Sequence, residues 1–237
     1  MNSPTLTPIP SAAQSTPRKP TPWYHPIFSP EHGVYVVLFV AFLTGAAAAQ
    51  HWTGATTLAL ICAFCGFQAE HPLVLQIKQR RSLKPRFLVW GGLYGGIAAA
   101  LALYLYWSLD LKQGEVLSPL LAIYAGAIVA FGVDAISVFY REQKSIWNEV
   151  ITFAAVCLTA PLAYLVTTGT LSALVLGLWV LNSLFFSSTI FTVKFRKDKT
   201  HAVTASVVYH AVATLLVAGL WLLGVLPLTT ALAFGVV

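Results

Sequence analysis

Long apolar runs, separated by short polar segments, fill most of the chain from residue 33 onward. A helix needs about 20 apolar residues to cross a bilayer. Seven runs reach roughly that length, at residues 33–49, 54–75, 87–109, 119–139, 150–167, 171–193 and 202–226. The pattern therefore predicts an all-α fold, a polytopic transmembrane helical bundle with about seven to eight spans.

The two ends of the chain depart from this pattern. Residues 1–28 are rich in Pro, Ser and Thr, hold no acidic residue and contain no apolar stretch like that of a signal peptide. They predict a disordered cytosolic tail that is not cleaved, with a transit peptide as the alternative, in front of a transmembrane helical domain at 29–237. Residues 227–237 supply only about half of a span, so we expect a half-span, an interfacial piece or a truncated end.

Composition supports a membrane protein, because 57% of the residues are hydrophobic and only 9% are charged. Soluble domains carry about 25% charged residues. The net charge of +6 does not indicate nucleic-acid binding, since the basic residues form short clusters between apolar runs. The predicted partner is the lipid bilayer, with a small-molecule or lipid ligand as a further candidate, and the oligomeric state stays open.

Basic residues also alternate between successive connections. Thirteen of the 14 Lys and Arg residues lie in the N-terminal tail and in the second, fourth and sixth connections, whereas Lys112 alone lies on the other side. By the positive-inside rule, the N-terminus and the basic loops are expected in the cytosol. The sequence thus predicts a multi-pass protein of a bacterial inner (or thylakoid) membrane.

The third apolar run begins with two overlapping pairs of glycines spaced four residues apart. Gly91 pairs with Gly95, and Gly92 pairs with Gly96. Small residues at this spacing let two helices approach closely in a membrane. We expect packing within the chain in preference to a dimer interface.

Ionisable and strongly polar residues near the spans are the candidates for function. A charged group at the centre of a membrane helix costs about 2.5 to 3.5 kcal/mol on insertion scales, so each one calls for a partner or a purpose. With the topology above, most of them lie toward the cytosol. The candidate ligand-binding residues are Glu31, His32, Glu70, His71, Asp134, Glu142, Glu149, Asn182 and His210.

Two of these candidates are near-copies, because Glu31-His32 and Glu70-His71 each set an acid beside an imidazole. Adjacent helical residues point about 100° apart, so one pair cannot serve one ligand face alone. Brought together from two helices, the four side chains could form a proton-transfer or metal-binding cluster. Helix capping is the alternative for Glu31, since an acid at a helix N-terminus complements the helix dipole.

Three further residues lie within or at the edge of the hydrocarbon. Asp134 precedes Arg141 by about 10 Å of helical rise, and it needs a proton, a polar cavity or an ion pair with a basic loop residue. Asn182 and His210 lie deeper, and hydrogen bonding across helices is the interpretation we favour for Asn182.

The cysteines give little indication of chemistry. Cys62 and Cys65 match C-x-x-C, but a structural zinc site would need about two more ligands at the same depth. Thiolates are also disfavoured in apolar surroundings, so buried and inert cysteines are expected. No metal site is predicted, the cofactor stays unknown, and the motifs of the usual soluble enzyme classes are absent.

Three segments resemble the YwiC-like membrane proteins. They are SPEHGVY at residues 29–35, REQKSIWNE at 141–149, and residues 182–195. The resemblance runs from about Ser29 to the C-terminus, and P-E-H-G is its most specific part. It implies a polytopic membrane fold and no particular activity.

A more distant similarity is to the UbiA-type prenyltransferases, which gather acidic residues at the cytosolic ends of spans to hold magnesium and a prenyl diphosphate. The corresponding places here would be Glu70 and the region 182–199. Neither place carries the paired D-x-x-x-D carboxylates that magnesium favours.

Three functions remain open on the sequence alone. The first is a carrier or binding protein with a cytosol-facing Glu/His/Asp cavity for a small ligand or protons. The second is a membrane-embedded enzyme acting on a lipid or prenyl substrate. The third is a non-catalytic membrane assembly factor.

Overall fold

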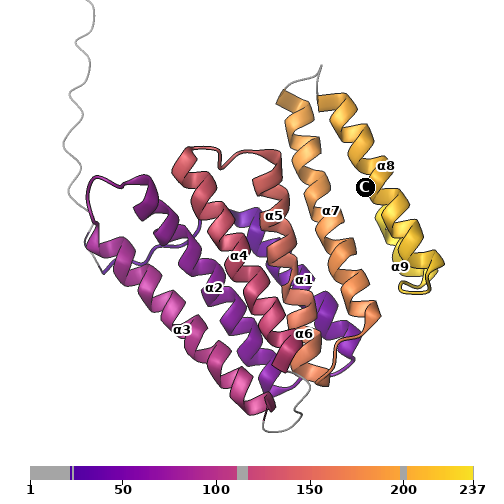
Figure 1. Ribbon diagram of the computed structural model, residues 1–237, viewed down its shortest axis with the longest axis horizontal. Helices are drawn as coiled ribbons and strands as arrows, with labels where there is room; N and C mark the ends of the chain where they lie inside the picture. Colours follow the sequence, from indigo (N-terminus) through magenta and orange to yellow (C-terminus); the bar gives the residue numbers. More distant parts are fainter. Residues whose placement is uncertain (1–21, 23, 111–116, 198–201, 237) are drawn as a thin grey trace, which may run out of the picture.

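The computed structural model describes residues 22, 24–110, 117–197 and 202–236, and the regular secondary structure in this part of the chain is all helical (Figure 1). Most of the predicted 1–28 tail lies outside the described residues. Seven stretches are long and apolar enough to cross a membrane, which confirms the predicted all-α polytopic bundle. The elements are α1 (His32–Ala49), α2 (Gly54–Lys78), α3 (Pro85–Asp110), α4 (Leu117–Tyr140), α5 (Ile146–Cys157), α6 (Thr159–Thr168), α7 (Ala173–Lys197), α8 (Ala202–Leu222), α9 (Leu228–Leu232) and η1 (Ala233–Val236).

The fifth span is a broken helix made of α5 and α6. The break lies next to Pro161, whose missing N–H cannot donate to the carbonyl of Cys157 one turn earlier. Helix α1 crosses α6 just after this point. A Cβ on Gly45 would lie 2.0 Å from the carbonyl oxygen of Ala160, so the two backbones are in direct contact there. Glycine at residue 45 is therefore required for this crossing.

Helices α2 and α3 form a long antiparallel pair, and one of the predicted glycine pairs lies in it. A Cβ on Gly91 would lie 2.9 Å from a Leu73 methyl group, and one on Gly95 would lie 3.7 Å from Cβ of Ala69. The expected packing within the chain is thus confirmed for these two glycines. Gly92 and Gly96 have no neighbour within 4 Å among the described residues and face outward.

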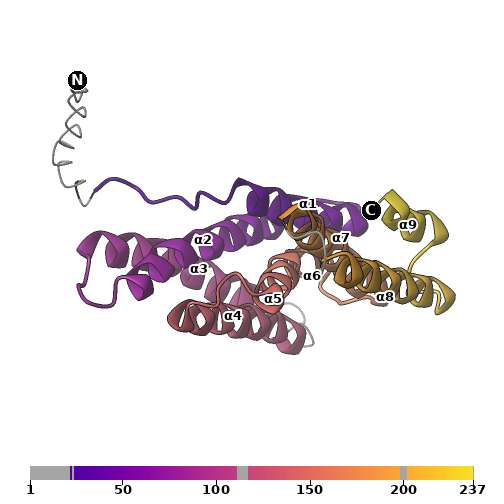
Figure 2. The same cartoon turned by 90° about the horizontal axis from the view of Figure 1, so that it is seen from above.

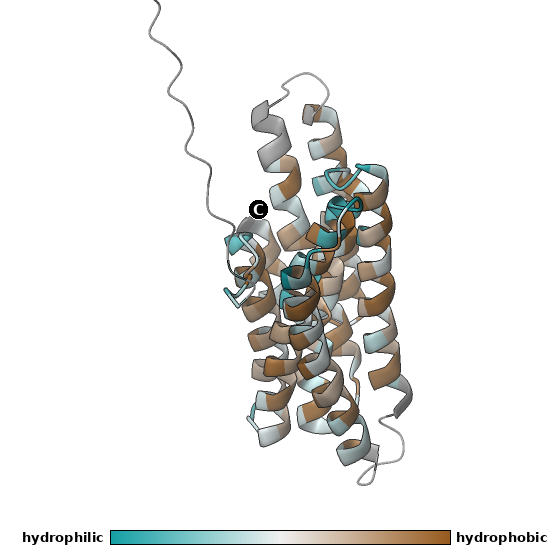
Figure 3. Cartoon of the chain, turned by 90° about the vertical axis from the view of Figure 1, so that its left-hand side faces the viewer, coloured by the Kyte–Doolittle hydropathy of each residue, from teal (hydrophilic) through white to brown (hydrophobic). Residues whose placement is uncertain are grey.

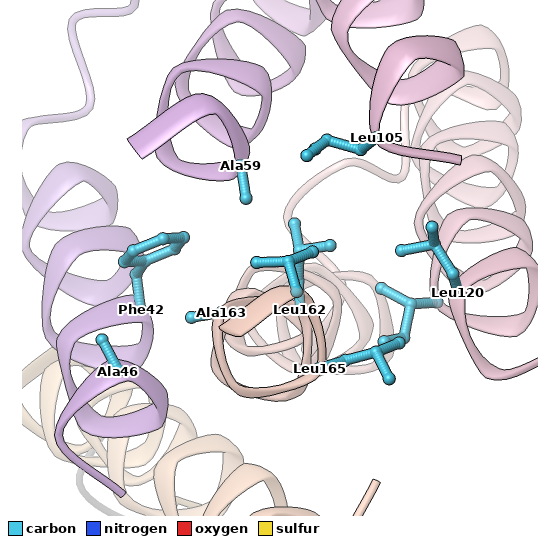
Figure 4. Packing of buried hydrophobic residues seen from close by; sticks show 10 residues of the cluster. Phe42, Ala46, Ala59, Leu105, Leu120, Leu162, Ala163 and Leu165 are labelled. Carbon is cyan, nitrogen blue, oxygen red and sulfur yellow. The ribbon is translucent and has the colours of Figure 1, made fainter. Parts of the chain in front are cut away.

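The central core lies between α1, α2, α3, α4 and α6 (Figure 4). Phe42 of α1, Leu105 of α3 and Leu165 of α6 are fully buried there, and Leu162 of α6 is nearly so. Large hydrophobic side chains also cover much of the outer surface, where the helices are brown in Figure 3. Because an apolar outside is stable in lipid and not in water, the chain is a multi-pass membrane protein.

The C-terminal helices stand at one side of this core (Figure 2). Helix α7 packs on α5, and α8 packs on α7 and on α9. Residues 227–236 form only the five-residue α9 and the turn η1, and Phe234 packs against Ala213 and Val217 of α8. The predicted short final segment is therefore a packed half-length piece and not a span.

One end of the bundle collects the hydrophilic connections. The start of α1, the α2–α3 connection, the α4–α5 connection, the end of α7 and the start of α8 all lie at this end (Figure 1), which is the teal end of Figure 3. The connections with basic residues thus share one side, as their alternation along the sequence predicted. We call this end the basic end.

Candidate functional site

A narrow cavity opens at the basic end, between the segment before α1, helix α2 and the α4–α5 connection. The space that the centre of a water molecule can reach inside it is about 20 Å³. This is room for about one water molecule or small ion. The lining residues come from three places in the sequence. They are Ser29, Glu31, Phe67, Glu70, His71, Val74 and Gln143.

An extended segment at residues 25–31 forms one wall of the cavity. The Ser29 N–H donates to Gln68 Oε1 of α2 at 3.2 Å, and the Tyr35 hydroxyl lies 3.1 Å from both the Ser29 carbonyl oxygen and Gln68 Oε1. Arg86 of α3 donates to the backbone oxygens of His25 and Pro26 at 3.0 and 3.3 Å. These bonds hold the segment across the ends of α2 and α3.

Glu31 lies at the mouth of the cavity, at the N-cap position of α1. Its side chain makes no capping hydrogen bond, so the capping interpretation lacks its expected contact. Partial burial raises the pKa of the Glu31 carboxyl above the ordinary value of 4.5, and the nearby carboxylates of Asp134 and Glu149 raise it further, against an opposing effect of Lys78. The Glu31 carboxyl therefore keeps its proton to a higher pH than an ordinary glutamate does.

Two carboxyl groups meet behind this mouth. Asp134 of α4 is only 4% exposed, and its Oδ1 accepts a 2.7 Å hydrogen bond from the Asn148 amide of α5. The half-buried Glu70 carboxyl lies close to the Asp134 carboxyl. Ionised carboxylates only accept hydrogen bonds, so a shared proton or another cation would stabilise two carboxyl groups this close together. Within the described residues the partner of Asp134 is thus an amide, and the predicted alternative of an ion pair with a basic loop residue is not seen.

The amide of Asn148 has a fixed orientation. Its Nδ2 donates to Asp134 Oδ1 at 2.7 Å and to the Gln143 backbone oxygen at 3.2 Å, and turning the amide over would place its oxygen against both acceptors. Asn148 Oδ1 and Asp134 Oδ2 are then left buried without a hydrogen-bond donor among the described atoms. Buried acceptors of this kind commonly accept a hydrogen bond from an ordered water molecule.

The other predicted residues lie elsewhere. His32 and Glu142 are exposed and do not line the cavity, whereas Glu149 contributes to it through its charge. Asn182 donates to Leu178 of its own helix at 2.9 Å, so the expectation of a bond across helices is wrong. His210 Nδ1 lies 2.7 Å from the Ser206 backbone oxygen on α8, away from the cavity.

Sequence reasoning missed four polar residues of the site: Ser29, Gln68, Gln143 and Asn148. Three of them carry uncharged amides, which give no strong signal of insertion cost in an apolar run. A usable signal was present for Gln68, because it lies two residues before Glu70 in the middle of a span. Asn148 lies beside the predicted Glu149.

The cysteines take no part in this site. Cys62, Cys65 and Cys157 are buried and free, and the Cys62 thiol lies 3.3 Å from the Ala98 carbonyl oxygen. The expectation of buried cysteines is confirmed. In the described part of the chain, no three His, Cys, Asp or Glu side chains are grouped to hold a metal ion.

Comparison with known proteins places the site within a family. No curated protein and no solved structure matches the chain. The YwiC-like protein family matches residues 28–164, which is more than half of the sequence and includes Glu31, Glu70, Asp134 and Asn148. Asn182 and His210 fall outside the matched region. The chain belongs to the YwiC-like family.

Proposed function

We propose that this membrane protein is a carrier or binding protein that takes protons or a small cation into the cavity at its basic end. One observation carries the proposal: the carboxyl groups of Glu31, before α1, and Glu70, on α2, line one opening, and Glu70 lies close to the buried Asp134 of α4. Acidic groups at membrane depth are costly unless they serve a path or a site. Their meeting at a shared opening supports a role in uptake.

The size of the cavity supports a small ligand. A space for about one water molecule fits a proton, a hydronium ion or a dehydrated monovalent cation, and it is far too small for a prenyl diphosphate. No grouping of acidic and imidazole ligands for a divalent metal accompanies it among the described residues. Both points weigh against the enzyme that acts on a lipid or prenyl substrate.

The basic connections suggest the direction of access. The cavity opens at the same end as the α2–α3 and α4–α5 connections, which hold Arg80, Arg81 and Arg141. By the positive-inside rule this end faces the cytosol. The proposed cavity is therefore filled from the cytosolic side.

Proton flux in proteoliposomes tests the proposal. The purified protein is reconstituted with a pH-sensitive dye inside the vesicles, and a pH step or a potential is imposed. We expect uptake above that of empty vesicles, and a loss of about tenfold or more in Glu70→Gln and in Asp134→Asn.

The matched control is Glu142→Gln, which removes an exposed carboxyl that does not line the cavity. Its uptake is expected to equal that of the unmodified protein. The proposal is wrong if the flux of protons, Na⁺ and K⁺ is no higher than in empty vesicles. It is also wrong if both site variants keep the full flux.

A further inference from the structure

The cavity at the basic end is polar on most of its sides. Five of its seven lining residues carry a polar side chain: Ser29, Glu31, Glu70, His71 and Gln143. A buried water molecule needs enough room and about two to four polar partners. This space has room for about one water molecule, and its lining offers the partners. The cavity therefore suits a single ordered water molecule.

The lining mixes hydrogen-bond donors with acceptors. Ser29 is only 6% exposed, and its hydroxyl oxygen accepts from the Glu31 backbone N–H at 3.4 Å, a bond that does not use the hydroxyl proton. The neutral imidazole ring of His71 carries one N–H donor and one acceptor nitrogen. A water molecule donates and accepts, so it can bond to both kinds of group, whereas a bare cation repels the donors. The mixture favours water over a cation as the occupant.

Two acids border this space from different segments. Glu31 lies at the mouth, before α1, and Glu70 lies on α2. Because the space holds about one water molecule, a single water there lies between the two carboxyl groups. A proton can pass through that water by exchange. The Glu31 carboxyl gives its proton to the water oxygen, and the water gives one of its own protons to the ionised Glu70 carboxylate. Glu31 is left ionised, Glu70 is protonated, and the water is regenerated.

An alkali cation is less well served by the same cavity. The space has no room for an ion together with its water shell, so the ion would have to leave the shell at the mouth. Taking an ion out of water costs several kcal/mol unless its ligands replace the shell. The imidazole of His71 suits zinc or copper and not a hard alkali ion. A proton needs no such dehydration, since it moves along hydrogen bonds.

We propose that the ion taken up is the proton, and that one water molecule held between Glu31 and Glu70 passes it inward while Ser29 and His71 orient that water. This inference rests on the proposed function and names the ion that the cavity accepts. The mouth is partly open to solvent, so protons also reach the water without Glu31. Glu31 therefore assists the transfer, and Glu70 receives the proton.

Filling the cavity without changing any ionisable group tests the water. Val74 lines the cavity and is 4% exposed, and in Val74→Ile the added methylene group takes the room of the water molecule. Proton flux into proteoliposomes is expected to fall by about tenfold or more. The matched control is Val138→Ile, the same change at an equally buried valine of α4 that does not line the cavity. Its proton flux is expected to equal that of the unmodified protein.

Two further measurements accompany this one. Uptake of radioactive Na⁺ and K⁺ into the same vesicles is expected to be no higher than in empty vesicles. Ser29→Ala removes one hydrogen-bonding partner of the water and adds no volume, so it is expected to slow proton flux by about fivefold. Variants are compared only where size-exclusion chromatography shows a folded monodisperse protein.

The outcomes separate this inference from the proposed function. Full proton flux in folded Val74→Ile overturns the water-mediated step, and full flux in Ser29→Ala overturns it if Val74→Ile does not fold. Uptake of Na⁺ or K⁺ without proton flux overturns the inference and leaves the proposed function standing. The absence of flux for all three ions removes both.

Discussion

The two Glu-His pairs of the chain are near-copies in sequence and lie in different surroundings. Glu70 and His71 both line the cavity, and the Glu70 carboxyl lies beside the buried Asp134. Glu31 lies at the mouth with its side chain partly open to solvent, and the exposed His32 does not line the cavity. The same dipeptide thus contributes two wall residues in one place and a single entrance residue in the other.

The difference follows from where each pair lies relative to its helix. Glu70 and His71 are well inside α2, between the buried Gln68 and Pro72, so both backbones are fixed against α3 and α4. Glu31 precedes the first residue of α1, where the chain changes from extended to helical. The surroundings in space, and not the dipeptide itself, decide which acid is a candidate for ion binding.

The sharpest test of this contrast removes one carboxyl from each pair. Glu70→Gln is expected to lower uptake into proteoliposomes by about tenfold or more, whereas Glu31→Gln lowers it by less than about threefold. The reason is that the Glu70 carboxyl lies close to the Asp134 carboxyl, while Glu31 lies at the entrance of the cavity. Equal losses of uptake in the two variants would show that Glu31 and Glu70 are equally important, and would contradict the proposed difference between the two pairs.

A second test displaces the helix that carries the first pair. In Gly45→Ala the new methyl group would overlap the Ala160 carbonyl oxygen at the crossing of α1 and α6. We expect a loss of about 3 kcal/mol in folding stability, measured by thermal unfolding in detergent. Gly92→Ala is the control, because a Cβ there meets nothing within 4 Å. Similar curves for both variants would contradict the backbone contact.

The two histidines give a smaller contrast. His71→Ala is expected to slow uptake by about fivefold, or roughly 1 kcal/mol, because the ring lines the cavity and can bond a bound water. His32→Ala is expected to leave uptake unchanged. A pH profile recorded for both variants separates a proton-transfer role of His71 from simple packing, which would shift the rate equally at every pH.

The smallest expected effect is on how folding stability depends on pH. The raised pKa of Glu31 means that, above its ordinary 4.5, the folded state binds more protons at this residue than the unfolded state. Stability contributed by Glu31 therefore falls as pH rises through that window and stays lower above it.

Glu31→Gln removes this penalty. The variant is expected to be more heat-stable than the unmodified protein at pH 7 and indistinguishable from it near pH 4, where Glu31 is protonated in both states. Glu142→Gln serves as the control. If Glu31→Gln changed the heat stability by the same amount at pH 4 and at pH 8, the effect would not come from the titration of Glu31.

Much of the fold was predictable because membrane solvation leaves a strong pattern in the sequence. Apolar length located the seven spans, and alternating basic connections placed Glu31, Glu70 and Asp134 at the same end. The break at Leu158 was not foreseen, since hydropathy is continuous across it and Pro161 is tolerated in the first turn of α6.

The site was predictable only in part, because a shared depth does not say which helices adjoin. The sequence could not show that α4 places Asp134 against Glu70 or that Asn148 turns its amide toward that carboxylate. It did show that adjacent helical residues diverge, and His32, next to Glu31, does not line the cavity. For Asn182 the sequence reading favoured another helix, whereas its amide is satisfied one turn back along α7.

The attachment of the N-terminal segment to α3 has a mechanical consequence. Arg86 of α3 donates hydrogen bonds to the backbone oxygens of His25 and Pro26. These two residues lie shortly before Ser29, which lines the cavity. The same segment is bonded to α2, because the Ser29 N–H donates to Gln68. A displacement of α3 relative to α2 would therefore strain the segment between Pro26 and Ser29, so these bonds oppose such a displacement and keep the cavity at a constant width.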